Sequence, residues 1–325
     1  MTGLNASDIG GAAILLEIGA EYEVIDPLQR GEVVNAGAAA QRAGIRPQVM
    51  DGYLRTLERL GLVTAVDGST PGVRATPALM DRIHDIGYVI WGFRACEPLI
   101  AHAREFARDP ADAQERYQRD GGFIARAAQW MGERGFYPQT ERAILARKPA
   151  RIVDIGCGGG RLLVKCLTQL PDAQAVGIDL NPKACAQARE AARAAGVADR
   201  LTIIERSEES LADDPGPLAG ADVIHAAWVF HDLLPHAEAT LDRLLSVCAS
   251  AGPDVSLVIG EAVPYADGAT EATFSAAFSF LHEHFMGRQF LGEAEWTRKL
   301  HAAGFTHVDV ERFVWPGGRL YTAIR

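Results

Sequence analysis

The sequence predicts an α/β fold, with a mostly parallel sheet covered by helices in the second half of the chain and a helical domain before it. From Pro149 onward, short apolar runs alternate with segments of helical pattern, the order typical of βαβ units. A glycine-rich turn joins the first run to a helix, and the 325 residues suffice for two hydrophobic cores. Strands are predicted at 152–155, 175–178, 201–204, 223–227, 256–259 and 308–310, with helices such as 182–195 and 237–249 between them.

The first 82 residues show a winged-helix pattern in an otherwise all-helical domain. The expected elements are helices at 9–18, 35–44 and 46–60 and two wing strands, 61–66 and 72–77, around Asp67-Gly68. A winged helix serves either DNA binding or dimerisation. Arg55 and Arg59 on the longer helix are offset by Asp51 and Glu58, which favours dimerisation.

Residues 83–148 are rich in aromatic side chains and are interrupted by Pro98, Pro110 and Pro138. Because proline breaks helices, this stretch is predicted to form several helical segments, serving as a linker and as a lid over a substrate pocket. The predicted boundaries are therefore 1–82 for the winged helix, 83–148 for the helical linker and 149–325 for the catalytic domain.

Composition excludes several classes of function. The formal net charge of −10 argues against general nucleic-acid binding, which needs a basic face. The apolar runs are too short to span a bilayer, and the N-terminal residues lack the pattern of a signal peptide. The five cysteines show no CxxC spacing and are interpreted as reduced thiols. A cytoplasmic protein with no nucleic-acid or membrane partner is expected.

The most informative motif is the stretch from Arg151 to Leu163, Arg-Ile-Val-Asp-Ile-Gly-Cys-Gly-Gly-Gly-Arg-Leu-Leu. Gly156, Gly158 and Gly160 let the backbone turn tightly and approach a ligand, while the next helix points its N-terminal amides at the turn. Asp154 precedes the first glycine. A second apolar strand ends in Asp179, at the distance expected for a ribose-binding carboxylate.

These residues resemble motif I and its successor in class I S-adenosylmethionine (SAM)-dependent methyltransferases, which have a Rossmann-like fold. The resemblance implies that the glycines pass under the methionine part of SAM and that Asp154 organises the loop or contacts the amino group through water. It further implies that Asp179 accepts from the ribose hydroxyls. The predicted cofactor-binding residues are Asp154, Gly156, Gly158, Gly160, Asp179, Leu180, Ser207 and Glu208.

A second motif, Asp222-Val-Ile-His-Ala-Ala-Trp228-Val-Phe-His231-Asp232, resembles the histidine-aspartate segment of plant-type small-molecule O-methyltransferases. Those enzymes also carry an N-terminal winged-helix dimerisation domain, so the resemblance covers nearly the whole chain and implies a homodimer. In that family the histidine at the position of His231 is the general base that deprotonates a phenol. Imidazole suits this task because its ordinary pKa lies near neutrality.

Two departures from that pattern point to different chemistry. Ala227 stands where the family commonly has lysine, and a later helix carries His282 and His284. With His231 and Asp232, these histidines form a plausible metal constellation. This resembles a smaller branch of the fold, the metal-dependent C-methyltransferases of α-keto acids, which hold iron or zinc. Since residues two apart diverge on a helix, His282 and His284 cannot both face the pocket equally, and spacing does not choose between them.

An α-keto acid also needs a partner for its carboxylate. Arg119 and Arg126 lie on the segment where this fold covers the site, and a bidentate arginine suits a carboxylate. Trp91 and Trp228 are expected as apolar walls of the substrate pocket.

The preferred hypothesis is SAM-dependent C-methylation at the β-carbon of a small α-keto acid through a metal-chelated enolate. The resemblance places such a reaction in peptide antibiotic or nonproteinogenic amino acid metabolism. Methylation of carbon beside a ketone needs an enolate, and a cation stabilises its oxygen, whereas a phenol needs no metal. The alternative is metal-independent O-methylation with His231 as base. A winged-helix regulator that senses SAM is a third hypothesis, which the acidic charge disfavours.

Overall fold

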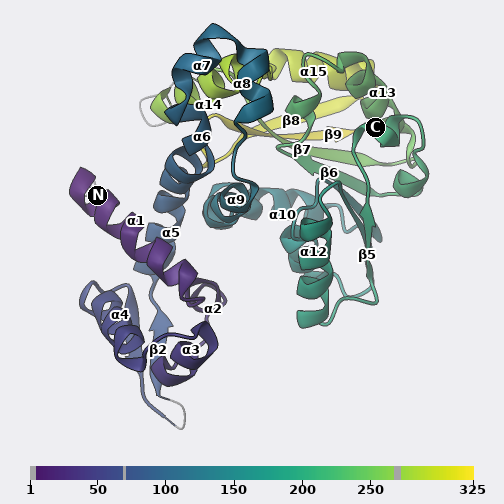
Figure 1. The fold of residues 1–325 in the computed structure, drawn as a ribbon. Helices are drawn as coiled ribbons and strands as arrows, with labels where there is room; N and C mark the ends of the chain where they lie inside the picture. The colour runs from purple at the N-terminus through teal and green to yellow at the C-terminus, as the bar shows by residue number, and fades with distance from the viewer. Residues whose placement is uncertain (1–4, 69–70, 267–271) are drawn as a thin grey trace. The chain divides into compact units, whose positions relative to one another are not determined.

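The computed structural model describes residues 5–68, 71–266 and 272–325, which fold into two compact units (Figure 1). Unit 1 comprises Met1–Pro98 and Arg119–Glu133, and unit 2 comprises Leu99–Gln118 and Arg134–Arg325. The helical stretch predicted at 83–148 therefore contributes to both units.

Unit 1 begins with α1 (Ala6–Glu21), whose first turn is capped by the side chain of Asn5. Helix α3 (Ala36–Ala43) ends at Gly44, which has a left-handed φ of 66°. Helix α4 (Pro47–Arg59) buries an apolar face, whereas Leu60, the last residue of the helix predicted at 46–60, lies just beyond it and is exposed. The remaining helical elements in this part of the chain are α2 (Ile25–Gln29), α5 (Pro77–Ile90), the π-turn Trp91–Ala95, α6 (Glu97–Ala101) and α9 (Gly121–Gly135).

A two-stranded antiparallel sheet, β1 (Val63–Val66) and β2 (Gly72–Ala75), follows α4. The N-terminal domain is therefore not all-helical, and its small sheet occupies the two stretches in which wing strands were expected. The turn predicted around Asp67-Gly68 extends into residues 69–70, which lie outside the described ranges.

Unit 2 is built on a seven-stranded sheet with the order β5-β4-β3-β6-β7-β9-β8. The first five strands in this order run parallel, and β9 pairs antiparallel with both β7 and β8. In Figure 1 the last two strands are drawn in yellow beside β7. The strands are β3 (Arg151–Ile155), β4 (Gln174–Asp179), β5 (Leu201–Glu205), β6 (Val223–Ala227), β7 (Ser256–Ala262), β8 (His307–Arg312) and β9 (Gly318–Ile324).

The central strands read as continuous apolar runs because both faces of the sheet are covered. One face packs its Val, Ile and Leu side chains against α13 (Glu238–Ser250) and α15 (Glu293–Ala302), with Trp296 and Leu300 fully inside this core. The other helices of the unit are α7 (Ala103–Arg108), α8 (Pro110–Arg116), α10 (Tyr137–Ala146), α11 (Arg161–Gln169), α12 (Pro182–Ala194) and α14 (Ala272–His284).

Strand β9 was missed by the sequence analysis, although it is almost completely buried. It follows the turn Trp315-Pro-Gly-Gly and pairs with β7 over seven residues. Its insertion makes the sheet mixed. Because β3 to β6 are parallel, their carboxyl ends meet at one edge, where ligands bind in open α/β sheets.

All five cysteines are buried free thiols. Burial raises the pKa of Cys96 to about 11 and that of Cys166 to about 12. These thiols are therefore poor nucleophiles at neutral pH. No helix of the described residues is long and apolar enough to cross a membrane.

Candidate active site

The predicted glycine turn lies at the carboxyl end of β3 and leads directly into α11. Gly156, Gly158 and Gly160 all have positive φ values, 74°, 52° and 71°, which L-residues with a side chain adopt at a cost. A Cβ atom on Gly156 would lie only 2.2 Å from Cγ2 of Val229. The conformation of this turn therefore depends on glycine, and the amides of Gly156 and Cys157 donate to the Ile178 carbonyl at the edge of the sheet.

Asp179, at the end of β4, holds the glycine turn. One carboxylate oxygen accepts from the Gly158 amide at 2.8 Å, and the other accepts from the Asn181 amide at 2.8 Å. Each oxygen has a further lone pair, so the carboxylate can still accept from a ribose hydroxyl. The neighbouring Leu180 is 62% exposed.

Asp154 has a partner that the sequence analysis did not foresee. It is buried in β3, and its Oδ1 lies 2.6 Å from Nδ1 of His225, the residue beside it on β6. Because a carboxylate can only accept, the His225 Nδ1 carries the proton. The bond ties the strand that leads into the glycine turn to its neighbour.

Ser207 and Glu208 follow β5, which lies beside β4 on the side away from β3. Burial raises the pKa of the Glu208 carboxyl, and the negative charges of Asp232, Glu209 and Asp179 act in the same direction. Residues from the ends of β4, β5 and β6 therefore lie within electrostatic reach of one another. The Ser207 carbonyl accepts from the Ser210 hydroxyl at 2.7 Å.

His231 is held by a buried carboxylate. It lies in a short 3-10 turn after β6, and its Nδ1 is 2.8 Å from Oε2 of Glu261 on β7. The other oxygen of Glu261 accepts from the backbone amides of Phe230 and His231. Glu261 is only 1% exposed. Because the carboxylate accepts the Nδ1 proton, Nε2 is the ring nitrogen able to take a proton or bind a metal.

The structure brings His282, and not His284, together with His231. The rings of His231 and His282 lie 5.4 Å apart at 78°, and His282 is 1% exposed. Its Nδ1 donates to the Phe278 carbonyl at 2.8 Å. As in His231, Nε2 is therefore the nitrogen that can accept a proton or bind a metal. His284 lies on the exposed side of α14, with its side chain 51% exposed and close to Glu283.

Asp232 lies beside this pair but faces an arginine. Its Oδ1 is 3.8 Å from Nε2 of His231 and 3.3 Å from Nε of Arg288. Within the described residues, no group of three or more His, Cys, Asp or Glu side chains is arranged to hold a metal. The donor chemistry nevertheless fits a metal, since both histidines have the outer hydrogen bond typical of metal ligands.

An aromatic cluster adjoins the histidines. Trp228 has a left-handed φ of 59° and packs against Trp315, with ring centroids 4.5 Å apart. Trp315 in turn contacts Phe278, which lies against His282. The cluster comprises Phe136, Trp228, Phe274, Phe278, Phe290, Phe313 and Trp315. It gives His282 an apolar, aromatic surrounding.

The other predicted substrate residues belong to unit 1. Arg126 pairs with Glu17 and Glu21, both at 3.6 Å, and lies over the ring of Phe123. Trp91 is buried within the π-turn after α5. Arg119 is half-buried at the start of the second segment of this unit.

The sequence analysis did not predict two residues of the site, Glu261 and Arg288. Glu261 had a usable signal, because it is an acid at the end of an otherwise apolar run, directly beside the strand that precedes His231. Arg288 had none. It lies in an irregular segment and reaches Asp232 only through the tertiary fold.

Comparison with known proteins agrees with this geometry. Residues 153–253 match the family model of a methyltransferase domain. The release factor glutamine methyltransferase of Cereibacter sphaeroides is 34% identical over 140 residues, covering 34% of this chain and 50% of that protein. Methyltransferase ungE' of Aspergillus campestris is 32% identical over 152 residues, covering 45% of this chain and 43% of that protein. The chain thus spans half or less of these curated relatives.

Solved structures match over nearly the full length. PigF with SAH has a TM-score of 0.61 at 18% identity, covering 99% of this chain and 100% of that one. Human N-acetylserotonin methyltransferase in complex with SAM has a TM-score of 0.55 at 15% identity, covering 100% and 99%. Mitomycin 7-O-methyltransferase MmcR has a TM-score of 0.53 at 20% identity, covering 97% and 94%.

The fold is therefore the Rossmann-like methyltransferase fold with a mixed central sheet and an N-terminal helical domain. Together with the family match over residues 153–253, it shows that the chain contains a methyltransferase domain.

Proposed function

We propose that the protein transfers the methyl group of SAM to the β-carbon of a small α-keto acid. The observation that carries this proposal is the pair of buried imidazoles, His231 and His282, whose rings lie 5.4 Å apart beside Asp232. A base for O-methylation needs one histidine. A second buried histidine with its own fixed tautomer is explained by a site that binds a metal.

His231, Asp232 and His282 would hold an iron or zinc ion. Such an ion would supply Lewis-acid stabilisation of the negative charge that develops on a ketone oxygen when the neighbouring carbon is deprotonated. His284 is too exposed to belong to this set. Asp232 is the weakest member, because its carboxylate also pairs with Arg288.

The chain's own groups would orient and enclose the reactants. Glu261 would orient His231 through its Nδ1 proton, and the glycine turn with Asp179 would position SAM at the sheet edge. The aromatic cluster excludes water from the place where the methyl group is transferred. These roles support transfer to carbon in a site closed to solvent.

The alternative is metal-independent O-methylation of a small molecule, with Nε2 of His231 as general base. Its support is the His231–Glu261 bond, which suffices for a base without a metal. The names of mitomycin 7-O-methyltransferase and of N-acetylserotonin methyltransferase point to small-molecule substrates in proteins of this fold. We keep this as the second candidate.

We also propose that the protein acts as a homodimer through unit 1, with no nucleic-acid partner. The support is the helical unit with its two-stranded sheet and the balanced charge of α4, on which Arg55 pairs with Asp51 at 2.8 Å. A sedimentation experiment on the full chain tests the dimer.

Metal analysis with two matched histidine variants tests the preferred function. Wild type is expected to carry iron or zinc and to methylate β-carbons of α-keto acids. His282→Ala should lose the metal and lower turnover by about 100-fold or more. His284→Ala should keep the metal and the wild-type turnover, because the His284 side chain is exposed.

The readouts separate the two candidates. Chelator-treated protein should lose turnover while its affinity for SAM, measured by calorimetry, stays the same. Full activity of metal-free protein on phenols, with none on α-keto acids, would establish O-methylation instead.

A further inference from the structure

We propose that Arg288 binds the carboxylate of the substrate and so selects acids over their neutral analogues. This inference rests on the proposed function, in that it assumes an α-keto acid. It assigns the anion-binding role to a residue next to the reacting histidines.

Arg288 and His231 both approach the same carboxylate oxygen of Asp232. Asp232 Oδ1 lies 3.3 Å from Nε of Arg288 and 3.8 Å from Nε2 of His231. Nη1 of Arg288 also donates to the Asp232 carbonyl at 2.5 Å. In an α-keto acid the carboxylate and the β-carbon are separated by the ketone carbon alone. A cation this close to His231 therefore matches the compact polar end of that substrate.

The guanidinium has N–H donors that are not used in its contacts with Asp232. Its Nη2 makes no hydrogen bond or ion pair within residues 5–68, 71–266 and 272–325, and its side chain is 35% exposed. Arginine carries five N–H donors in a planar fork that suits a carboxylate. Arg288 can therefore bind an anion without first breaking its contact with the Asp232 carbonyl.

The charges around the site favour such a cation. Asp232, Glu209 and Asp179 act on Glu208 as negative charges, and the buried Glu261 carboxylate bonds to His231. These carboxylates favour SAM, whose sulfonium is positive, but they repel an anionic acceptor. Arg288 pairs with Asp232, the member of this group beside His231, so its positive charge offsets the repulsion of a substrate anion there.

The segment that carries Arg288 is braced on two sides. Its backbone amide donates to the His282 carbonyl at 2.8 Å, which couples it to α14. On the outer side, Phe285 stacks on Phe106 of α7, and Gln114 of α8 donates to the Phe285 carbonyl at 3.0 Å. Arg288 is thus presented by a packed turn.

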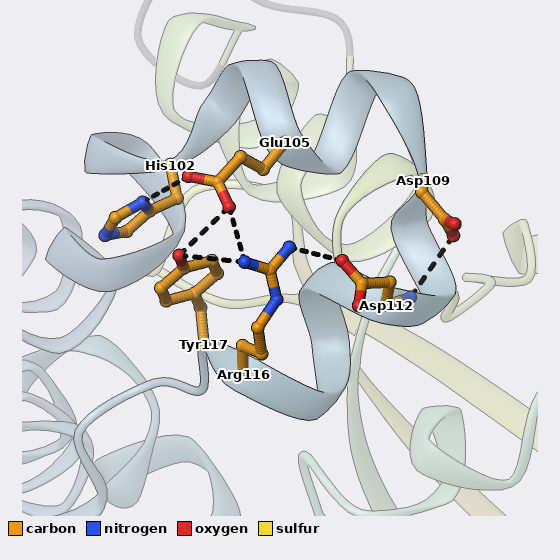
Figure 2. A network of polar contacts seen from close by, with 6 residues as sticks. All are labelled: His102, Glu105, Asp109, Asp112, Arg116 and Tyr117. Atoms are coloured by element: carbon orange, nitrogen blue, oxygen red, sulfur yellow. Dashed lines mark hydrogen bonds and ion pairs between the residues drawn. The ribbon is translucent and has the colours of Figure 1, made fainter.

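A polar network ties α7 to α8, the two helices that contact Phe285 (Figure 2). The Glu105 carboxylate accepts from Nδ1 of His102 at 2.8 Å and from the Tyr117 hydroxyl at 2.9 Å, and it pairs with Arg116 at 3.0 Å. Arg116 also contacts Asp112. By joining the two helices, these contacts keep Phe106 and Gln114 in position against Phe285.

The test compares each acid with its methyl ester, which has the same shape near the ketone but no charge. Phenylpyruvate and 4-methyl-2-oxopentanoate serve as aromatic and aliphatic probes. In Arg288→Gln the KM for the accepted acid should rise about 10- to 100-fold with little change in kcat, because a charged hydrogen-bonded pair is lost. The KM for the ester should not change. Arg288→Lys should recover part of the loss.

Three controls keep the outcome clear. Arg142→Gln removes another arginine of unit 2, paired with Glu311, and should leave both KM values unchanged. Thermal unfolding, SAH affinity and metal content report whether Arg288→Gln is folded and keeps its site. An equal rise in KM for acid and ester would mean that Arg288 only holds Asp232, and would overturn the inference. Wild type that uses neither acid nor ester would instead overturn the proposed function.

Discussion

The two halves of the site are built in different ways. The cofactor half is a local backbone structure, in which Gly156, Gly158 and Gly160 adopt positive φ within five consecutive residues. The acceptor half is assembled from side chains of three separated segments, with His231, Glu261 and His282 joined by tertiary packing. The first half therefore depends on conformation and the second on hydrogen-bond partners. Substitutions in the cofactor half should therefore weaken SAM binding, whereas substitutions in the acceptor half should lower kcat.

The largest effect is expected at Glu261. Replacing its carboxylate by the amide of Gln removes the charge that orients His231 and presents N–H groups to backbone donors. We expect kcat to fall about 100-fold or more, while the affinity for SAH stays within about twofold. Steady-state kinetics and calorimetry measure the two quantities.

The matched control for Glu261→Gln is Glu311→Gln, an exposed carboxylate in unit 2 that pairs with Arg142. Its kcat should equal that of wild type. If Glu261→Gln keeps the wild-type kcat, His231 needs no carboxylate partner and the description of the acceptor half is wrong.

A smaller effect in the opposite half is expected from Gly156→Ala. The new Cβ would lie 2.2 Å from Val229, on a backbone with a φ of 74°. We expect the Kd for SAM to rise about 10- to 50-fold, because the turn must shift by strain of a few kcal/mol. The kcat at saturating SAM should fall much less.

Gly159→Ala is the control within the same turn. Gly159 is not among the glycines of positive φ, and its nearest neighbour for a new Cβ is Oε1 of Gln187 at 3.8 Å. The Kd for SAM should change by less than about threefold, since that contact is ordinary. Equal losses in both variants would show that side-chain bulk, and not conformation, controls the cofactor half.

The same contrast explains what the sequence could predict. The strands from 152 to 259 and the glycine turn were predicted because their signals are local, in hydrophobic runs and glycine spacing. Strand β9 was missed because its position in the sheet, between β7 and β8, is set by pairing with segments distant in sequence. The choice between His282 and His284 depended on which face of α14 packs against His231.

The partners of site residues were the least predictable part. Asp154 was expected to organise the loop or contact SAM, which stays a prediction, and its bond to His225 on the neighbouring strand was not foreseen. Glu261 and Arg288 approach His231 and Asp232 over separations of 30 and 56 residues. No periodic pattern encodes such contacts. They follow from strand order and from the path of a turn, which the sequence analysis did not resolve.

The smallest expected effect concerns Glu208, which lies between the two halves. Burial and the charges of Asp232, Glu209 and Asp179 raise the pKa of its carboxyl above that of the unfolded chain. An acid shifted this way stabilises the fold below its unfolded pKa, and that contribution is lost as pH rises through the folded pKa. At neutral pH the ionised carboxylate of Glu208 therefore destabilises the folded state.

Glu208→Gln should accordingly raise the melting temperature of the SAH-free protein at pH 8 by about 1 to 2 °C. The difference should shrink as the pH falls through the raised pKa of wild-type Glu208, because the carboxyl then becomes neutral. Glu205→Gln, at the end of β5, is the control and should show no such trend. A melting temperature of Glu208→Gln below that of wild type at pH 8 would show that the carboxylate is instead stabilised by its surroundings. The acidic edge would then be a set of compensated charges, and the electrostatic need for Arg288 would be weaker.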